Sequence, residues 1–102
     1  MVFFSGQIPL DPKTGLLVGE DVGAQVEQVL DNVETLLRDA GLTTDHVVKS
    51  TIFLTDMADF AVVNEAYAKR FRAPWPARST IQVAGLPKGA LVEIEIIAAR
   101  PA

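Results

Sequence analysis

The clearest pattern in the chain is a run of apolar residues spaced three and four apart between residues 22 and 40. Its members are Val22, Val26, Val29, Val33, Leu36, Leu37 and Ala40. Only a helix places residues at this spacing on one face. Asp21 stands before the run as an N-cap, and Gly41 after it is suited to a helix end that needs positive φ. The pattern therefore predicts a helix over residues 22–40.

A second amphipathic helix is predicted after residue 59. Phe60, Val63, Tyr67 and Phe71 recur at helical spacing. The residues before Phe60 include good capping side chains, and the Pro-Trp-Pro sequence at residues 74–76 stops the helix.

Four further segments have the β-branched content or the alternation typical of strands. They are residues 2–8, 47–54, 78–84 and 91–99. In the last of them, Val92, Ile94 and Ile96 share a face opposite Glu93 and Glu95.

The predicted order is β-α-β-α-β-β in a single domain over residues 1–102, which indicates an α+β fold. We expect a sheet of four or more strands with both helices on one face. The uncovered face carries apolar residues such as Ile97. A small domain of this kind usually buries such a face against copies of itself.

The composition of the chain excludes several classes of function. Of 102 residues, 49% are hydrophobic and 22% charged, which is typical of a globular protein. The net charge of −4 disfavours non-specific nucleic-acid binding. The chain has no cysteine and one histidine, which excludes disulfides, a thiol nucleophile and a metal site rich in those ligands. No targeting segment or membrane-length apolar stretch is visible, so we expect a soluble cytoplasmic protein with no nucleic-acid or membrane partner.

Common catalytic motifs are absent, including the GxGxxG, Walker A and HExxH patterns. His46 stands at the edge of a predicted strand without a nucleophile elbow, so we interpret it as a surface residue rather than part of a triad. Lys49 lacks flanks that establish an apolar pocket, so a solvated strand lysine is favoured over a Schiff-base lysine.

The last two strands carry a more specific pattern. If they pair as an antiparallel hairpin, one register places Arg78 and Thr80 on the same face as Glu93 and Glu95. That face lies opposite the aliphatic residues Ile81, Val83, Ile94 and Ile96. The group fits either a structural cross-strand Arg–Glu pair or a carboxylate-binding arginine beside a proton-transferring glutamate.

The Ser5-Gly6-Gln7 sequence lies inside the first predicted strand. A glycine in a strand interior indicates either a β-bulge or a close approach by a ligand or another backbone segment. The sequence leaves both interpretations open.

Three segments carry a family resemblance: residues 5–15 (SGQIPLDPKTG), 76–80 (PARST) and 86–95 (LPKGALVEIE). With them, nearly the whole chain resembles the reactive intermediate deaminase family, also called Rid or YjgF-like and described in places as endoribonuclease or translation inhibitor. The RidA branch is the most similar.

The resemblance implies a chorismate-mutase-like α+β fold and a homotrimer with sites in clefts between subunits. It implies hydrolysis of 2-imino acids or their enamine tautomers, such as 2-iminobutanoate and 2-iminopropanoate, to 2-oxo acids and ammonia. Because the imine is already reactive, no cofactor or metal is expected. The implied role is removal of reactive metabolites.

Family roles transfer to five positions of this chain. Arg78 matches the arginine that holds the substrate carboxylate, and Glu93 the glutamate that positions and activates water. Thr80 stands where many members have cysteine, and its backbone N–H is expected to contact the carboxylate. Ser5 matches a serine that lines the pocket near the imine, and Asn64 an asparagine near the cleft.

The resemblance also implies a further N-terminal segment, with a strand and a Gly-Pro-Tyr stretch whose tyrosine reaches the site. This chain starts inside the second family strand, and its single tyrosine is Tyr67 on the second predicted helix. This departure keeps open the alternative of a non-catalytic trimer that binds a small 2-oxo acid. The older description of the family keeps open a third function, that of an RNA-cleaving translation inhibitor.

Overall fold

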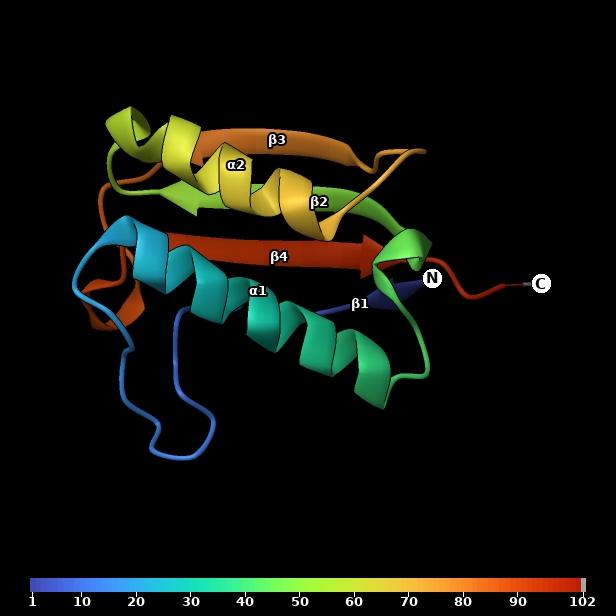
Figure 1. Cartoon of the computed structure of the whole chain (residues 1–102). Coiled ribbons are helices and arrows are strands. Elements are labelled where there is room, and N and C mark those ends of the chain that lie inside the picture. The colour runs from blue at the N-terminus through green and yellow to red at the C-terminus, as the bar shows by residue number, and fades with distance from the viewer. Residues whose placement is uncertain (102) are drawn as a thin grey trace.

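The computed structural model describes residues 1–101 and has a four-stranded sheet with two α-helices (Figure 1). The strands are β1 (Val2–Phe3), β2 (Val47–Leu54), β3 (Ala77–Gln82) and β4 (Val92–Ala98). The helices are α1 (Val22–Asp39) and α2 (Phe60–Arg70), with short 3₁₀ turns η1 (Thr44–His46), η2 (Met57–Asp59) and η3 (Pro87–Gly89). The predicted β-α-β-α-β-β order and the α+β class are confirmed.

Both helices form where the sequence pattern predicts them. The carboxylate of Asp21 accepts a hydrogen bond of 2.8 Å from the backbone N–H of Ala24 and so caps α1. Gly41 follows the helix with φ of 75°, the left-handed conformation that glycine adopts without strain. In front of α2, the side chain of Asp56 caps the short turn η2.

The strand order β1-β4-β2-β3 differs from the predicted hairpin of the last two strands. β4 pairs antiparallel with β2, while β3 pairs parallel with β2 on its other side. The reason is that α2 connects β2 to β3 as a β-α-β unit, which makes these two strands parallel neighbours. β4 then takes an inner position, where Val92, Ile94 and Ile96 are buried.

The first strand is shorter than predicted, because its hydrogen-bonded pairing with β4 is interrupted and then resumes. β1 covers Val2 and Phe3, and Gln7 forms an isolated bridge with Ile94 further along β4. Residues 5–6 lie between these two paired stretches, which agrees with the irregularity that the Ser-Gly sequence indicated.

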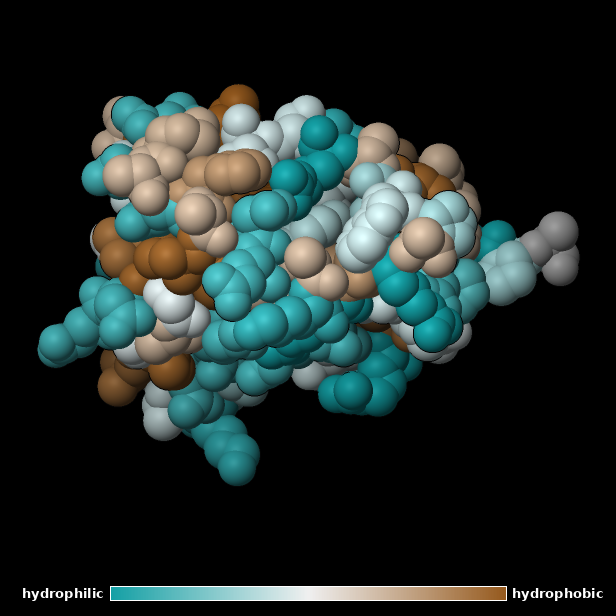
Figure 2. Space-filling model, turned by 45° about the horizontal axis from the view of Figure 1, so that its top comes forward, coloured by the Kyte–Doolittle hydropathy of each residue, from teal (hydrophilic) through white to brown (hydrophobic). Residues whose placement is uncertain are grey.

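The helices pack on one face of the sheet, as predicted (Figure 1). Between the helices and the sheet lies a single core whose most buried large members include Val26, Leu30, Ile52, Leu54 and Ile94. On the side shown in Figure 2, a band of hydrophilic residues crosses the molecule, and apolar residues are confined to groups beside it. None of the helices in the described part of the chain has the length and apolarity to cross a membrane.

The face of the sheet away from the helices is open. The strand register arranges its side chains in three rows across β4, β2 and β3: Glu93–Phe53–Ile81, Glu95–Thr51–Ser79 and Ile97–Lys49–Ala77. We call these nine residues and Phe3, which pairs with Ile97, the open sheet face. It exposes large apolar side chains, with Phe3 73% and Ile81 45% exposed.

Candidate active site

Arg78 lies beneath α2 at the edge of the sheet. Its position on β3 is paired with Ser50, which places the side chain on the helix-covered face. The Nη1 atom donates a hydrogen bond of 2.7 Å to Oδ1 of Asn64. The guanidinium carbon lies 5.0 Å from the ring centroid of Tyr67 and 5.6 Å from that of Phe60. One face of α2 therefore supplies all three of these contacts.

A cleft of about 400 Å³ opens beside Arg78, which is within the range of small-molecule sites. Its lining residues are Asn64, Tyr67, Ala68, Trp75, Pro76 and Arg78. Trp75 is 57% exposed and forms part of the wall. Within residues 1–101, no carboxylate forms an ion pair with Arg78. Its positive charge is therefore free to bind an anionic group.

Two contacts fix the side chain of Tyr67, which lines this cleft. Its hydroxyl donates a hydrogen bond of 2.8 Å to Oγ of the fully buried Ser50. Its ring stacks on Phe71, with centroids 4.3 Å apart. Burial raises the pKa of the Tyr67 hydroxyl, and the hydrogen bond to Ser50 opposes this only in part. The side chain is therefore a neutral phenol at neutral pH.

Glu93 lies on the open sheet face, beside Phe53. Desolvation by partial burial raises the pKa of its carboxyl, and the negative charge of Glu95 raises it further. A Cβ atom built on Gly6 would lie 2.0 Å from Oε2 of Glu93. Gly6 thus leaves the space that the carboxylate occupies, so the group that approaches this glycine is a side chain rather than the ligand or backbone that we had considered.

The predicted grouping of Arg78 and Thr80 with Glu93 and Glu95 on one face is wrong. Arg78 and Thr80 pair with the helix-facing Ser50 and Ile52 of β2, whereas Glu93 and Glu95 pair with Phe53 and Thr51 on the opposite side. Because β2 separates β3 from β4, the two strands have no direct register with each other. No cross-strand Arg78–Glu93 pair forms within the described chain, and Ile81 lies on the same face as Glu93 rather than with Ile94.

The predicted residues thus form two separate groups. Arg78 and Asn64, with Tyr67, make the arginine half-site on the helix side of the sheet, and Thr80 lies two residues further along the same side of β3. Glu93 and Gly6 make the glutamate half-site on the other side, and Ser5 precedes Gly6 in the chain.

Sequence reasoning missed the aromatic contacts of Arg78. Phe60, Asn64 and Tyr67 have helical spacing, which was a usable signal that they share a face of α2. From the sequence, Phe60 and Tyr67 were interpreted only as part of the apolar face of the second predicted helix. Trp75 was assigned only to the segment that ends the second helix, although it lies three residues before Arg78.

His46 and Lys49 have the structural roles that their sequence context favours. Nδ1 of His46 accepts a hydrogen bond of 2.9 Å from the backbone N–H of Thr43 and completes a capping box at η1. Nζ of Lys49 donates to Oγ of Ser79 at 2.9 Å on the open sheet face. Across residues 1–101, no three His, Cys, Asp or Glu side chains are placed to hold a metal ion.

Comparisons with known proteins bear on the whole chain. Residues 1–100 match the family described as Endoribonuclease L-PSP. The chain is 52% identical over 103 residues to 2-iminobutanoate/2-iminopropanoate deaminase of Salmonella typhimurium, covering 98% of this chain and 80% of that protein. It is 55% identical over 98 residues to Reactive Intermediate Deaminase A, chloroplastic, of Arabidopsis thaliana, covering 96% of this chain and 52% of that protein. The crystal structure of Escherichia coli TdcF with bound serine matches with a TM-score of 0.90 at 44% identity, over 97% of this chain and 80% of that chain.

Proposed function

The chain belongs to the Endoribonuclease L-PSP family, which includes proteins named reactive intermediate deaminase, and from this premise we propose that it hydrolyses 2-imino acids to 2-oxo acids and ammonia. The family membership confirms the resemblance inferred from the sequence. The proposed substrates are 2-iminobutanoate and 2-iminopropanoate, which pyridoxal-phosphate dehydratases release from threonine and serine. The proposed setting is the cytoplasm, where the protein would remove these reactive compounds.

The observation that carries the proposal is the environment of Arg78. Its contacts with Asn64, Tyr67 and Phe60 are all with neutral groups, and it borders a cleft of about 400 Å³. A guanidinium that is positioned but not neutralised is well suited to a bidentate grip on a substrate carboxylate. The structure of the E. coli relative TdcF contains bound serine, which carries a carboxylate group, and this is consistent with the assignment.

Glu93 is the proposed general base. The oxygen of water adds to C2 of the imine while Glu93 takes a proton from that water. Glu93 then returns this proton to the nitrogen, which gives the carbinolamine. Glu93 next carries the hydroxyl proton of the carbinolamine to the amine, the C2–N bond breaks, and ammonia leaves as the carbonyl forms. A carboxyl whose pKa is raised by burial is better matched to this proton transfer near neutral pH than an exposed one. Ser5 is proposed to lie near the imine, and the backbone N–H of Thr80 to contact the carboxylate.

The separation of the two half-sites favours a site built from two copies of the chain. Arg78 and Glu93 lie on opposite faces of one sheet, so a single chain cannot present both to one substrate. The exposed apolar residues of the open sheet face support burial of that face against further copies. We therefore propose a homotrimer in which the arginine half-site of one copy meets the glutamate half-site of the next.

Imine lifetime tests the proposed activity. A dehydratase generates 2-iminopropanoate from serine, and semicarbazide traps the imine that remains. We expect the chain to shorten the imine lifetime and Arg78→Ala to lose roughly a hundredfold or more of that acceleration, because a charged hydrogen-bonded contact with the substrate is removed. An unaccelerated reaction from a folded, assembled protein would contradict the deaminase proposal.

Mixing two inactive variants tests the composite site. Arg78→Ala and Glu93→Gln chains are unfolded together and refolded as hybrids. Some interfaces in the hybrids then combine an intact Arg78 with an intact Glu93, so part of the activity is expected to return. Each variant refolded alone is the control, and a mixture that stays as inactive as its components would contradict a site shared between copies.

A second candidate is a trimer that binds a small 2-oxo acid without turnover. It is favoured by one observation: the arginine half-site is complete within one chain and is separate from Glu93. Titration calorimetry with 2-oxobutanoate distinguishes the two. Binding without any change in imine lifetime would support this second candidate.

The family description names an endoribonuclease, which is the third candidate. The net charge of −4 disfavours it, and Lys69, Arg70 and Arg72 are each paired with carboxylates. We expect no binding of single-stranded RNA at any salt concentration, measured by fluorescence anisotropy.

A further inference from the structure

The long side chain of Arg78 is positioned by few contacts, none of them an ion pair in the described chain. It lies on β3 at the edge of the sheet, is largely exposed, and makes one side-chain hydrogen bond, to Asn64, in the described chain. An arginine at such a position loses considerable rotamer freedom when it binds a ligand. The remaining restraint comes from the aromatic rings, with Tyr67 the nearer of the two.

Tyr67 is restrained from two other directions. Below it, Ser50 of the central strand β2 accepts its hydroxyl hydrogen bond, and beside it Phe71 stacks on its ring with an interplanar angle of 16°. Ser50 is also the residue paired with Arg78 across β2 and β3. The phenol of Tyr67 is thus hydrogen-bonded to β2, the strand that pairs with β3 at Arg78, and one face of its ring contacts the guanidinium.

We propose that Tyr67 is a positioning residue for carboxylate binding, which holds the guanidinium of Arg78 against its ring face before the substrate arrives. This inference rests on the proposed function of Arg78 as the carboxylate anchor. A ring face attracts a guanidinium through its quadrupole, without a negative charge. A carboxylate in the place of Tyr67 would restrain Arg78 equally well but would compete with the substrate for the same N–H groups.

Reversing the electrostatics of the ring at constant shape tests the proposal. Tyr67→Phe keeps the aromatic face and removes the hydroxyl, and pentafluorophenylalanine at position 67 has nearly the same shape with the sign of the quadrupole reversed. Both variants lose the hydrogen bond to Ser50, so they form a matched pair. Val63→Ala, a buried core change in the same helix, controls for general loss of stability.

We expect the fluorinated protein to bind 2-oxobutanoate roughly three- to tenfold more weakly than Tyr67→Phe, because the cation–π attraction is lost. In imine hydrolysis, KM is expected to rise by a similar factor while kcat changes little. Val63→Ala is not expected to separate KM from kcat in this way. Equal Kd and KM values for the phenyl and pentafluorophenyl proteins would overturn the proposal.

A second measurement does not depend on activity. Nuclear magnetic resonance of the Arg78 guanidinium reports how fast it rotates about its Nε–Cζ bond. We expect slow rotation in Tyr67→Phe and clearly faster rotation in the fluorinated protein. Failure of the unsubstituted chain to hydrolyse imines would contradict the proposed function and leave the positioning role of Tyr67 to be decided by the rotation rates. Equal rotation rates in the two variants would contradict the positioning role.

Discussion

At the residue scale, the absence of a side chain at Gly6 makes room for the carboxylate of Glu93. A methyl group there would lie 2.0 Å from Oε2, which is far inside contact distance. The clash is with the end of a flexible side chain, so the glutamate is expected to move while the backbone stays in place. Glycine at this position therefore serves the geometry of Glu93 rather than a turn.

We predict that Gly6→Ala reduces imine hydrolysis by roughly tenfold or more through a lower kcat, because even a small displacement of a catalytic group is costly. The melting temperature is expected to change little. The matched control is Gly85→Ala, where the added methyl group meets nothing within 4 Å. Equal activity of the two variants would show that Glu93 needs no such space.

The raised pKa of Glu93 predicts the pH dependence of the reaction. In the proposed mechanism the base is the ionised carboxylate of Glu93, so the acid limb of kcat/KM is expected above the usual glutamate value of 4.5. Since Glu95 contributes to the shift, Glu95→Gln is expected to move that limb to lower pH. The measurement is kcat/KM against pH, corrected for the uncatalysed reaction, and an unmoved limb in Glu95→Gln would contradict the assignment.

The raised pKa of Glu93 also affects the stability of the fold. A carboxylate usually has a lower pKa in the folded state and stabilises the fold when ionised, whereas ionisation of Glu93 is expected to destabilise it. A folded-state pKa above the unfolded value means that ionisation of Glu93 disfavours the folded state as pH rises through that interval. Glu93→Gln is therefore expected to unfold at an equal or higher temperature than the unsubstituted chain at pH 7. This separates the catalytic loss in that variant from any loss of folding.

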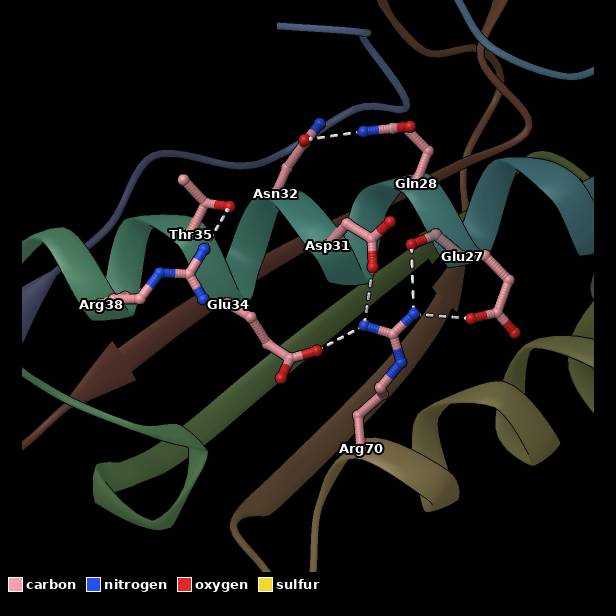
Figure 3. A network of polar contacts seen from close by, with 8 residues as sticks. All are labelled: Glu27, Gln28, Asp31, Asn32, Glu34, Thr35, Arg38 and Arg70. Carbon is pink, nitrogen blue, oxygen red and sulfur yellow. Dashed lines mark hydrogen bonds and ion pairs between the residues drawn. The ribbon is translucent and has the colours of Figure 1, made fainter.

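At the scale of elements, a single arginine connects the two helices. Arg70 of α2 reaches three carboxylates of α1: Glu27 at 2.7 Å, Asp31 at 3.0 Å, and Glu34 (Figure 3). Burial alone would lower the pKa of Arg70, but the three hydrogen-bonded carboxylates raise it well above its usual range. The network ties α2 to α1, and the same helix α2 carries the contacts of Arg78.

We predict that Arg70→Met lowers the free energy of unfolding by about 1–2 kcal/mol, because three neighbouring carboxylates lose their shared partner and then repel one another. Urea unfolding measures the loss, which is expected to shrink at high salt as the repulsion is screened. The control is Lys69→Met, whose exposed pair with Glu65 at 3.6 Å is expected to contribute under about 0.5 kcal/mol. Equal losses in the two variants would mean that the network adds nothing beyond one surface pair.

At the scale of the whole molecule, the two faces of the sheet differ in what covers them. One is buried under both helices, while the other exposes apolar side chains beside Glu93. The proposed homotrimer would cover the open face and bring the half-sites of neighbouring copies together. Assembly and catalysis should therefore be lost together.

We predict that Ile97→Lys, between Phe3 and Lys49 in the outermost row of the open sheet face, converts the proposed homotrimer to monomers and abolishes imine hydrolysis. The physical reason is the burial of a charge without a partner. Light scattering after size-exclusion chromatography measures the mass of each form. The matched control is Val62→Lys on α2, where the native side chain is 46% exposed and lies outside the open sheet face. A trimeric Ile97→Lys protein would place the interface elsewhere.

Local pattern was enough to predict most of the fold. The spacing of Val26, Val29 and Val33 and the capping by Asp21 specify α1, and alternation in residues 92–98 specifies the buried face of β4. These features are readable because helix and strand periodicities act between near neighbours in the chain. The segments around Ser5, Arg78 and Glu93 were likewise enough for the family resemblance, which the comparisons confirm.

Strand order and the facing of the site residues were decided by the tertiary structure. Whether Arg78 shares a face with Glu93 depends on which strand lies between β3 and β4, and β2 comes from a segment more than 20 residues before Arg78. The contacts of Arg78 with Asn64 and Tyr67 likewise join α2 to β3. Alternation within one strand tells which of its residues share a face, but only pairing between strands tells which faces coincide. The chain's residues therefore specify the two half-sites, and the fold places them on opposite faces of the sheet.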